Sequence, residues 1–216
     1  ISFFNFFKIN KEIDKNLILS AVINTNYHMV EASDRIRDNG YQQDRLEGGV
    51  MLNMKLKPSD HLRGFILMRS EFYDSKFIYL IPAAGAEWQF GTSSPFMLLV
   101  NAGRNYHKPA LNDLYWLPGG NPDLLPEDGY SGDITLSGDF NLGKIKVRNE
   151  VTSYISKINN WIMWQPASNG AYYQEAGNVK NVFSRGLEYQ LSGNFEMKEI
   201  VFRSGGNYAY THTANV

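Results

Sequence analysis

The side chains that most often carry out catalysis or bind metal ions are few and scattered in this chain. Its 216 residues include four histidines and no cysteine, so thiolate chemistry and a disulfide framework are excluded. None of the histidines has a second ligand at the spacing of a metal site; they are His28, His61, His107 and His212. The chain contains no nucleophile-elbow, phosphate-loop or dinucleotide-binding glycine motif. We therefore predict no enzymatic activity, no catalytic residues, no metal site and no cofactor.

Charged side chains gather on one face of two extended segments. They are Arg63, Arg69 and Glu71 in the first segment, and Lys146, Arg148 and Glu150 in the second. Such side chains can pair with each other, contact a substrate, or form the solvated face of a sheet; we favour pairing. The net charge of the chain is −1, which gives no reason to expect a nucleic-acid partner.

The elements that would position these side chains are long segments in which apolar and polar residues alternate. In segment 130–140 the apolar face holds Tyr130, Ile134, Leu136 and Phe140, and the polar face holds Ser131, Asp133, Thr135, Ser137 and Asp139. Because side chains alternate faces along a strand, one surface is apolar and the other is polar. Globular strands usually have about five to six residues, whereas a strand that crosses a bilayer needs about nine to eleven. The length of the alternation favours a membrane β-barrel.

The same pattern predicts about ten strands. They span residues 2–9, 17–30, 43–57, 61–72, 76–90, 96–106, 129–140, 144–157, 178–191 and 199–213. Short turns alternate with longer connections at 31–42, 107–128 and 158–177, and this rhythm is typical of barrels with short periplasmic turns and long extracellular loops. No run of about 18 apolar residues indicates a transmembrane helix. The predicted fold class is all-β, an antiparallel transmembrane β-barrel segment.

Aromatic residues make up 14% of the chain, and membrane barrels place such residues in rings at both interfaces. The candidates for these rings are Phe3, Tyr27, Trp88, Phe90, Tyr130, Phe140, Trp161, Trp164, Tyr208 and Tyr210. Cross-strand aromatic pairing in a soluble sheet is the alternative explanation.

One long loop carries a dense motif that begins at the end of a predicted strand. Its pattern is close to Gly-Arg-aromatic-x-x-Pro-x-x-x-Asp-Leu-Tyr, followed by Gly-Asn-Pro-x-Leu-x-Pro-Glu. The matching residues are Gly103, Arg104, Pro109, Asp113, Leu114, Tyr115, Gly120, Asn121, Pro122, Leu124, Pro126 and Glu127. On this motif the chain resembles TonB-dependent outer-membrane receptors. The resemblance covers roughly residues 76–213, and the first 75 residues fit it by their alternation alone.

The resemblance implies a segment of a larger barrel of about 22 strands in the outer membrane of a Gram-negative bacterium. Residues 1–216 are then expected to be a partial barrel domain, without the plug domain and the C-terminal strands. The implied partners are outer-membrane lipid, the TonB complex acting through a plug domain, and a small nutrient ligand such as a ferric siderophore, haem or cobalamin. The implied mechanism is capture by the outer loops followed by plug-gated passage.

Aromatic side chains in the long loops are the best candidates for ligand contact, because they offer large, rigid, amphipathic surfaces. They are Tyr115, Trp116, Trp161, Trp164, Tyr172 and Tyr173. For Asp123 and Glu127 in the same region, turn capping is favoured over ligand contact. Two alternatives remain open for the whole chain: a porin-type passive channel and a soluble all-β carbohydrate-binding module.

Overall fold

The computed structural model describes residues 1–34, 39–168, 170–179, 181–197 and 199–215. Its strands are β1 (Ser2–Asp14), β2 (Leu17–Asp34), β3 (Asn39–Ser59), β4 (Leu62–Tyr73), β5 (Lys76–Gln89), β6 (Phe96–His107), β7 (Glu127–Leu142), β8 (Ile145–Asn159), β9 (Ile162–Pro166), β10 (Gln174–Asn178), β11 (Val182–Met197) and β12 (Ile200–Asn215). A single short helix, α1 (Leu111–Tyr115), is found among the described residues.

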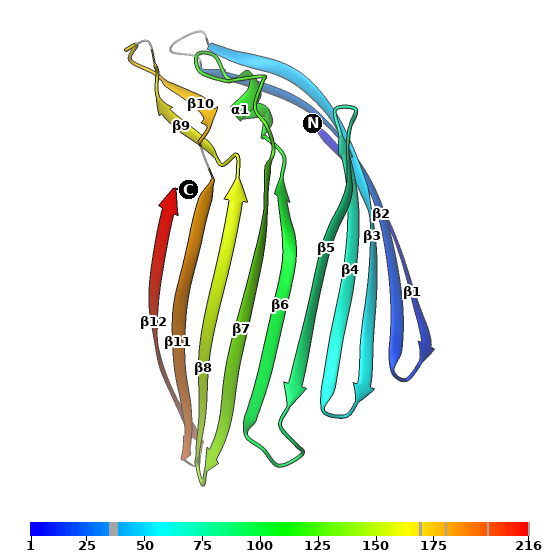
Figure 1. Ribbon diagram of the computed structural model, residues 1–216, viewed down its shortest axis with the longest axis vertical. Coiled ribbons are helices and arrows are strands. Elements are labelled where there is room, and N and C mark those ends of the chain that lie inside the picture. Colours follow the sequence, from blue (N-terminus) through cyan, green and yellow to red (C-terminus); the bar gives the residue numbers. More distant parts are fainter. Residues whose placement is uncertain (35–38, 169, 180, 198, 216) are drawn as a thin grey trace.

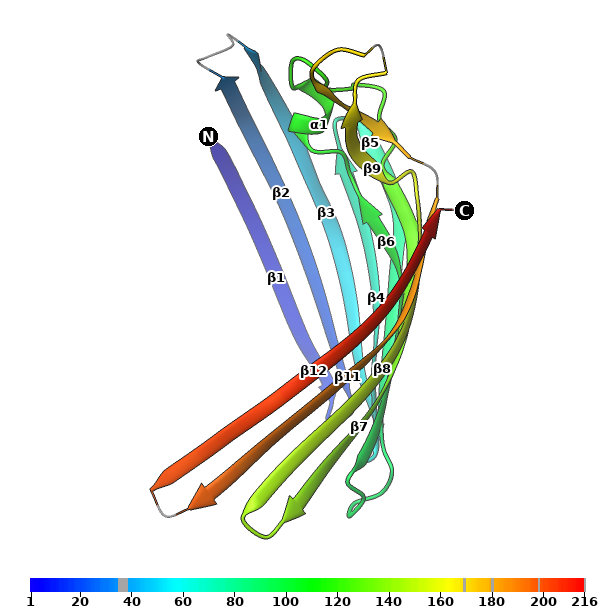
Figure 2. The same cartoon turned by 90° about the vertical axis from the view of Figure 1, so that its left-hand side faces the viewer.

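Ten of these strands form one antiparallel sheet in the order β1-β2-β3-β4-β5-β6-β7-β8-β11-β12. The sheet is strongly curved, like part of a barrel wall, and β1 and β12 are its two edges (Figures 1 and 2). Most of the short turns lie at one end of the sheet, and α1, β9, β10 and the short turn between β4 and β5 lie at the other (Figure 1). The predicted all-β fold class and the ten long strands are therefore confirmed.

The strand bounds differ from the predicted ones where polar residues continue a ladder. β2 and β3 remain paired up to Asp34 and Asn39, so the predicted connection 31–42 is shorter than expected, and residues 35–38 lie outside the described part. β11 begins at Val182 rather than at 178 and runs to Met197, through Ser192, Gly193 and Asn194. Backbone pairing continues there although the side chains are typical of a turn.

The connection 158–177, predicted to be a loop, contains the hairpin β9–β10. Each of these strands has five residues, too few to show a clear alternation in the sequence.

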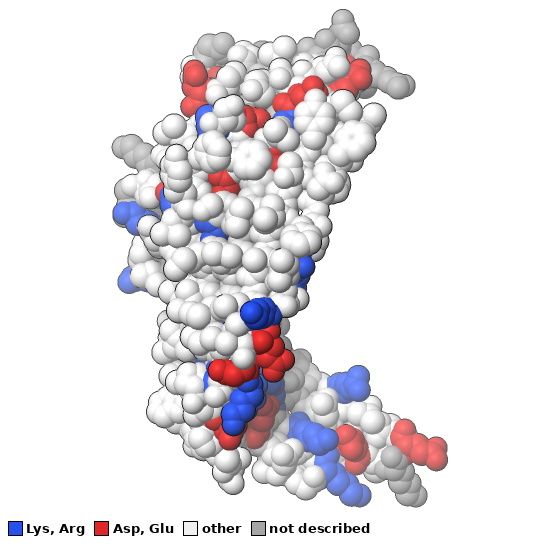
Figure 3. Space-filling view, turned by 90° about the vertical axis from the view of Figure 1, so that its right-hand side faces the viewer, with Lys and Arg blue, Asp and Glu red and all other residues white. Residues whose placement is uncertain are grey.

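The outer, convex face of the sheet is apolar and exposed. Cross-strand partners on this face include Val100 and Ile134, whose side chains are 41% and 47% exposed. Large apolar side chains exposed in such number do not occur on an ordinary water-soluble sheet. Figure 3 views the sheet from the side of β1: charged side chains gather at the lower end and again near the top, and the surface between is mainly white.

Aromatic side chains cluster on the outer face near both ends of the strands. At the lower end, the ring centroids of Trp88 and Phe90 are 4.7 Å apart, and those of Phe96 and Phe140 are 5.6 Å apart. At the upper end, Phe77 stacks on Tyr79 at 6.3 Å. From Phe77 to Trp88 along β5, a rise of about 3.3 Å per residue and a tilt of about 40° give roughly 28 Å, close to the apolar band of about 25 Å in membrane barrels.

Two of the ring candidates do not lie on the sheet. Trp161 is in the connection between β8 and β9, and Trp164 is in β9, so the prediction that they belong to an interfacial ring is wrong.

The inner, concave face is polar and its side chains pair with each other. Asn101 donates to Asp133 at 3.0 Å, and the hydroxyls of Thr135 and Thr152 are 2.8 Å apart. The charged groups noted in the sequence also pair, with Arg69–Glu71 at 3.0 Å, Arg148–Glu150 at 2.7 Å, Lys146–Glu196 at 3.5 Å and Arg63–Glu87 at 3.7 Å. Pairing of the charged side chains is thus confirmed. Among the described residues, no helix has the length and apolar character to cross a membrane.

Candidate functional site

The two longest connections fold together into one body at the upper end of the sheet. We call it the loop module; it comprises residues 108–126 with α1, and residues 160–179 with the hairpin β9–β10. Its core contains Leu114, Leu124 and Ala176, which are 7%, 2% and 3% exposed. Tyr115, Ile162 and Trp164 pack around this core. The loop module therefore has an apolar core of its own, built from segments about 50 residues apart.

Asp113 connects the two halves of the loop module. Its carboxylate accepts a bond from the backbone N–H of Ala110 at 3.1 Å and one from the indole N–H of Trp164 at 2.9 Å. The backbone carbonyl of Asp113 accepts the N–H of Asn121 at 2.8 Å. Charge-assisted bonds to a carboxylate are among the stronger hydrogen bonds in proteins. Asp113 therefore fixes both the start of α1 and the orientation of the Trp164 ring.

The substitution Asp113→Ala is expected to loosen the loop module by about 1–3 kcal/mol, because the indole and the α1 N-terminus lose their acceptor. Trp fluorescence and amide exchange of residues 110–126 would measure it. Asp123→Ala is the matched control: the Asp123 backbone N–H bonds to Asn121, and no bond of the Asp123 carboxylate is found among the described residues. Equal behaviour of the two variants would contradict this role of Asp113.

Asn178 joins the two halves of the loop module, and Glu127 of β7 joins the module to the sheet. The Asn178 amide accepts from the Leu125 N–H at 2.8 Å and donates to the carbonyls of Leu125 and Asn160 at 2.9 and 2.7 Å. Glu127 accepts the N–H of Ile162 at 2.9 Å. The favoured interpretation of Glu127 as a capping side chain agrees with this bond.

Gly119 allows the closest approach between the two halves. Its φ is +109°, and a Cβ at this position would lie 1.9 Å from the carbonyl oxygen of Gln174. The Gly119 carbonyl also accepts the N–H of Ala176 at 2.7 Å. A side chain here would be strained and would force β10 away.

The loop module is held on the sheet by Arg45 of β3. This side chain is 4% exposed, and it donates to Asp74 at 2.8 Å and to the carbonyl of Pro109 at 2.8 Å. Its guanidinium carbon lies 5.5 Å from the centroid of the buried Tyr73 ring. Lys108 adds an ion pair to Glu47 at 2.7 Å.

Aromatic rings add a second contact between the loop module and β3. The Tyr41 ring lies 6.4 Å from that of Tyr115 and 6.5 Å from that of Trp116, measured between centroids. Together with the Arg45 and Lys108 bonds, these contacts fix the loop module over the end of the sheet.

A cavity of about 530 Å³ lies between the loop module and the end of β2. It is lined by Asp34, Asn112, Trp116, Pro118, Trp164, Tyr173 and Gln174. Three of the six aromatic residues proposed for ligand contact thus share one cavity: Trp116, Trp164 and Tyr173. Aromatic walls with amide and carboxylate groups between them are suited to an amphipathic small molecule.

The other three aromatic candidates lie elsewhere. Tyr115 packs on the module core, Trp161 lies in the connection before β9, and Tyr172 is fully exposed. Asn112 and Gln174 were missed by the sequence reasoning, because amides in a loop carry no local signal of a cavity.

Comparison with known proteins assigns the family. The sequence profile described as "TonB dependent receptor-like, beta-barrel" matches residues 19–216. This chain belongs to that family. A vitamin B12 transporter, BtuB, from Photobacterium profundum is 36% identical over 107 residues, which are 47% of this chain and 17% of that protein. BtuB from Vibrio vulnificus is 27% identical over 92 residues, or 43% of this chain and 14% of that protein. The aligned parts of the chain span less than a fifth of these relatives.

Solved structures of a transporter and of a receptor share the fold. The copper transporter OprC superposes with a TM-score of 0.72 at 12% identity, covering 99% of this chain and 37% of that one. The siderophore receptor PirA from Pseudomonas aeruginosa superposes with a TM-score of 0.70 at 13% identity, covering 98% of this chain and 46% of that one. At such identities the likeness shows the fold alone. The named relatives are transporters and receptors rather than enzymes, so the non-enzymatic prediction is confirmed at the level of the family.

In this TonB-dependent receptor barrel, the structure gives the motif residues structural roles. Arg104 forms two bonds of 2.8 Å to the Asp128 carboxylate and donates to the carbonyl of Leu80. It sits just above the last paired residues of β5 and β6, Ala83 and Gly103, and so ties β5, β6 and β7 together where the β5–β6 ladder ends.

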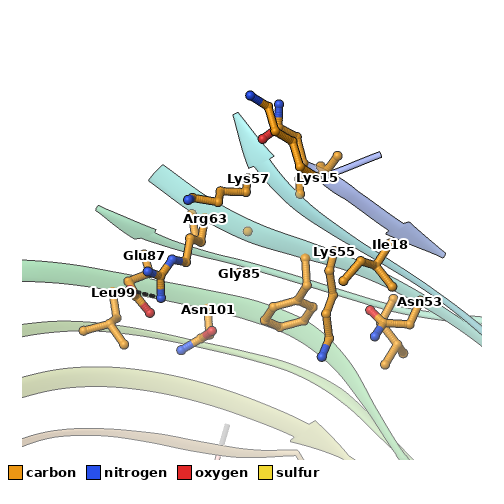
Figure 4. A pocket seen from close by; sticks show the side chains of 16 residues that line it. Lys15, Ile18, Asn53, Lys55, Lys57, Arg63, Gly85, Glu87, Leu99 and Asn101 are labelled. Carbon is orange, nitrogen blue, oxygen red and sulfur yellow. Dashed lines mark ion pairs between the residues drawn. The ribbon is translucent and has the colours of Figure 1, made fainter. Parts of the chain in front are cut away.

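A second cavity of about 490 Å³ lies on the inner face of the receptor barrel, near the lower turns (Figure 4). Its apolar floor contains Ile18, Phe65, Leu67 and Leu99, and its rim carries Lys15, Lys55, Lys57, Arg63 and Glu87. Phe65 and Leu67 interrupt the polar side of the alternation in 61–72 because they form this floor.

Proposed function

We propose that this chain is part of the β-barrel of an outer-membrane TonB-dependent receptor that imports a scarce nutrient. The observation that carries the proposal is an aromatic-walled cavity in a folded loop module, placed at one end of a sheet whose outer face is apolar and exposed. Such a sheet suits a bilayer, and loops at the strand ends suit ligand capture. We also propose that the chain lies in the outer membrane of a Gram-negative bacterium.

Residues 1–216 would supply one part of a larger barrel, with a plug domain and further strands contributed by the rest of the receptor. Both edge strands, β1 and β12, have one unpaired side among the described residues, which supports neighbours in a closed barrel. The inner cavity, with its apolar floor and cationic rim, is suited to packing against a plug. Energy would reach that plug from the TonB complex.

Cobalamin is the first ligand to test, because the curated relatives are vitamin B12 transporters. Ferric siderophores and haem are the next candidates. A porin-type channel and a soluble carbohydrate-binding module are less well supported, since the family profile matches most of the chain and the outer face is apolar.

Alanine at Trp116 or at Tyr173 in the full receptor is expected to weaken ligand binding about 10- to 100-fold, as for aromatic anchors in a recognition site. The measurement is equilibrium binding of cyanocobalamin, a ferric siderophore and haemin to receptor in outer-membrane vesicles. Tyr79→Ala, on the outer face, is the control and should bind like the wild type. Unchanged affinity of both loop variants for every probe that binds the wild type would refute the site.

A further inference from the structure

Three basic side chains interrupt the apolar outer face at its upper end. They are Lys157 of β8, Arg185 of β11 and His212 of β12, and we call them the outer-face cationic cluster. Arg185 is the direct cross-strand partner of both Ile155 and His212, and Lys157 is opposite Tyr130 and Phe183. Cross-strand partners share a face, and Ile155 is an exposed outer-face residue, so the three basic residues also face outward.

The cluster is compact. Arg185 and His212 are directly opposite each other, which corresponds to about 4.5–5.5 Å between Cβ atoms, and Lys157 is diagonal to Arg185, which corresponds to about 7–8 Å. The upper ends of β8, β11 and β12 lie side by side, below the hairpin β9–β10 (Figures 1 and 2).

No protein group neutralises the cluster within the described part of the chain. Most inner-face cations lie within 4.0 Å of a carboxylate, as Arg69 does, whereas neither Lys157 nor Arg185 has such a partner there. The outer-face residues around them on β8, β11 and β12 carry no acidic group; they are Ser153, Ile155, Asn159, Phe183, Leu187, Tyr208, Tyr210 and Ala214. On the neighbouring β7, Asp128 is diagonal to Lys157, and its carboxylate is bonded to Arg104. The positive charge is thus available to an external anion.

The height of the cluster places it at the edge of the apolar band. Arg185 is ten residues above Phe195, and His212 is ten residues above Phe202, the two rings that stack at the lower end of β11 and β12. Ten residues of tilted strand rise roughly 25 Å, about the thickness of the apolar band of a membrane barrel. A lysine or arginine at that depth costs about 0–1 kcal/mol, against about 2–4 kcal/mol at the midplane.

We propose that the outer-face cationic cluster binds the phosphate groups of anionic glycolipids in the outer leaflet of the membrane. A guanidinium matches phosphate with two parallel bonds, and an ammonium adds a point charge. The phenols of Tyr130 and Tyr210, which are 64% and 57% exposed, flank the cluster and can donate to the same headgroup. Directly below, Ile155 and Leu187 continue into the apolar band, so one molecule meets its phosphate at the cluster and its acyl chains beneath.

This inference rests on the proposed outer-membrane location, which makes the upper end of the sheet the outer-leaflet end. A free phosphate ion would use the charges but not the adjoining apolar surface. A phosphorylated lipid uses both, and it is the occupant that the continuity of the two surfaces favours.

The test measures lipid retained by the full receptor in detergent micelles doped with bisphosphorylated lipid A or with its dephosphorylated form. The double variant Lys157→Gln/Arg185→Gln is expected to lose affinity for the phosphorylated lipid by on the order of 30-fold, from about 1 kcal/mol per cation. The wild type should bind the dephosphorylated lipid as weakly as the variant does. Lys157→Arg should retain binding.

The matched control is Lys11→Gln/Lys144→Gln, which removes two positive charges near the opposite end of the sheet and should bind like the wild type. Equal retention by the cluster variant and the wild type would overturn the inference. The inference would also be overturned if the wild type bound inorganic phosphate alone, at millimolar concentration, as tightly as it binds the phosphorylated lipid, since the site would then be one for a soluble ion.

Heat-modifiable migration on a gel checks that each variant is folded. If the wild-type receptor does not fractionate with the outer membrane, the proposed function itself fails. If the receptor does fractionate with the outer membrane but binds the phosphorylated and the dephosphorylated lipid equally well, only this inference fails.

Discussion

The substitution Leu191→Arg is expected to destabilise the folded receptor in a bilayer by about 2–4 kcal/mol, the cost of a cation near the midplane of a membrane barrel. Leu191 of β11 is 40% exposed on the outer face, four residues above Phe195 and six below Arg185. The charge would face acyl chains, with no water at that depth to solvate it.

The neighbouring residue provides the control. Gln190 pairs with Glu150 and Asn207 on the inner face, so Gln190→Arg puts the same charge one residue away on the polar side. We expect it to change stability by less than about 1 kcal/mol. Urea unfolding in lipid vesicles measures both variants. Equal losses at 190 and 191 would contradict the assignment of the two faces.

The substitution Arg45→Met is expected to release the loop module from the sheet and to weaken its docking by about 2–4 kcal/mol, because Pro109 and Asp74 lose a buried partner. The lower part of that range allows for the partial exposure of Asp74, whose side chain is 32% exposed. The substitution keeps most of the aliphatic volume, so the change reports the lost bonds rather than a large cavity.

Amide exchange distinguishes release of the loop module from general unfolding. Protection of residues 110–126 and 162–178 should fall roughly 30-fold or more, while the lower halves of β6 and β7 remain protected. Arg69→Met is the control, since Arg69 pairs with Glu71 on the inner face and is 40% exposed. Uniform loss of protection across the sheet would show that Arg45 stabilises the whole fold and not the docking of the loop module.

The sheet could be predicted from the sequence because apolar and polar residues alternate along each strand according to the environment of the two faces. Ile134 and Leu136 lie on the apolar outer face, and Thr135 between them lies on the polar inner face, so the alternation is local and continuous. Strand ends were less predictable, since the backbone ladder of β11 continues to Met197 through the polar residues Ser192 and Asn194.

The loop module could not be predicted, because its stability comes from contacts distant in sequence. Arg45 meets Pro109 across 64 positions, and Trp164 meets Asp113 across 51. The motif marked Asp113 and Glu127 as notable residues without indicating what they bind. No periodicity in the five-residue strands β9 and β10 indicated a hairpin, so Ala176 was not recognised as a core residue.

The central claim is that lipid covers the outer face of the sheet, and single-cysteine spin labelling along β11 tests it most directly. Residues 1–216 contain no cysteine, so labels can be placed singly at 187–192 without other changes in this part of the receptor. In vesicles, labels at 187, 189 and 191 should be accessible to oxygen, which partitions into lipid. Labels at 188, 190 and 192 should instead be accessible to a water-soluble nickel complex. Loss of this two-residue alternation, with the odd positions shielded from both reagents as in a packed protein core, would contradict the account.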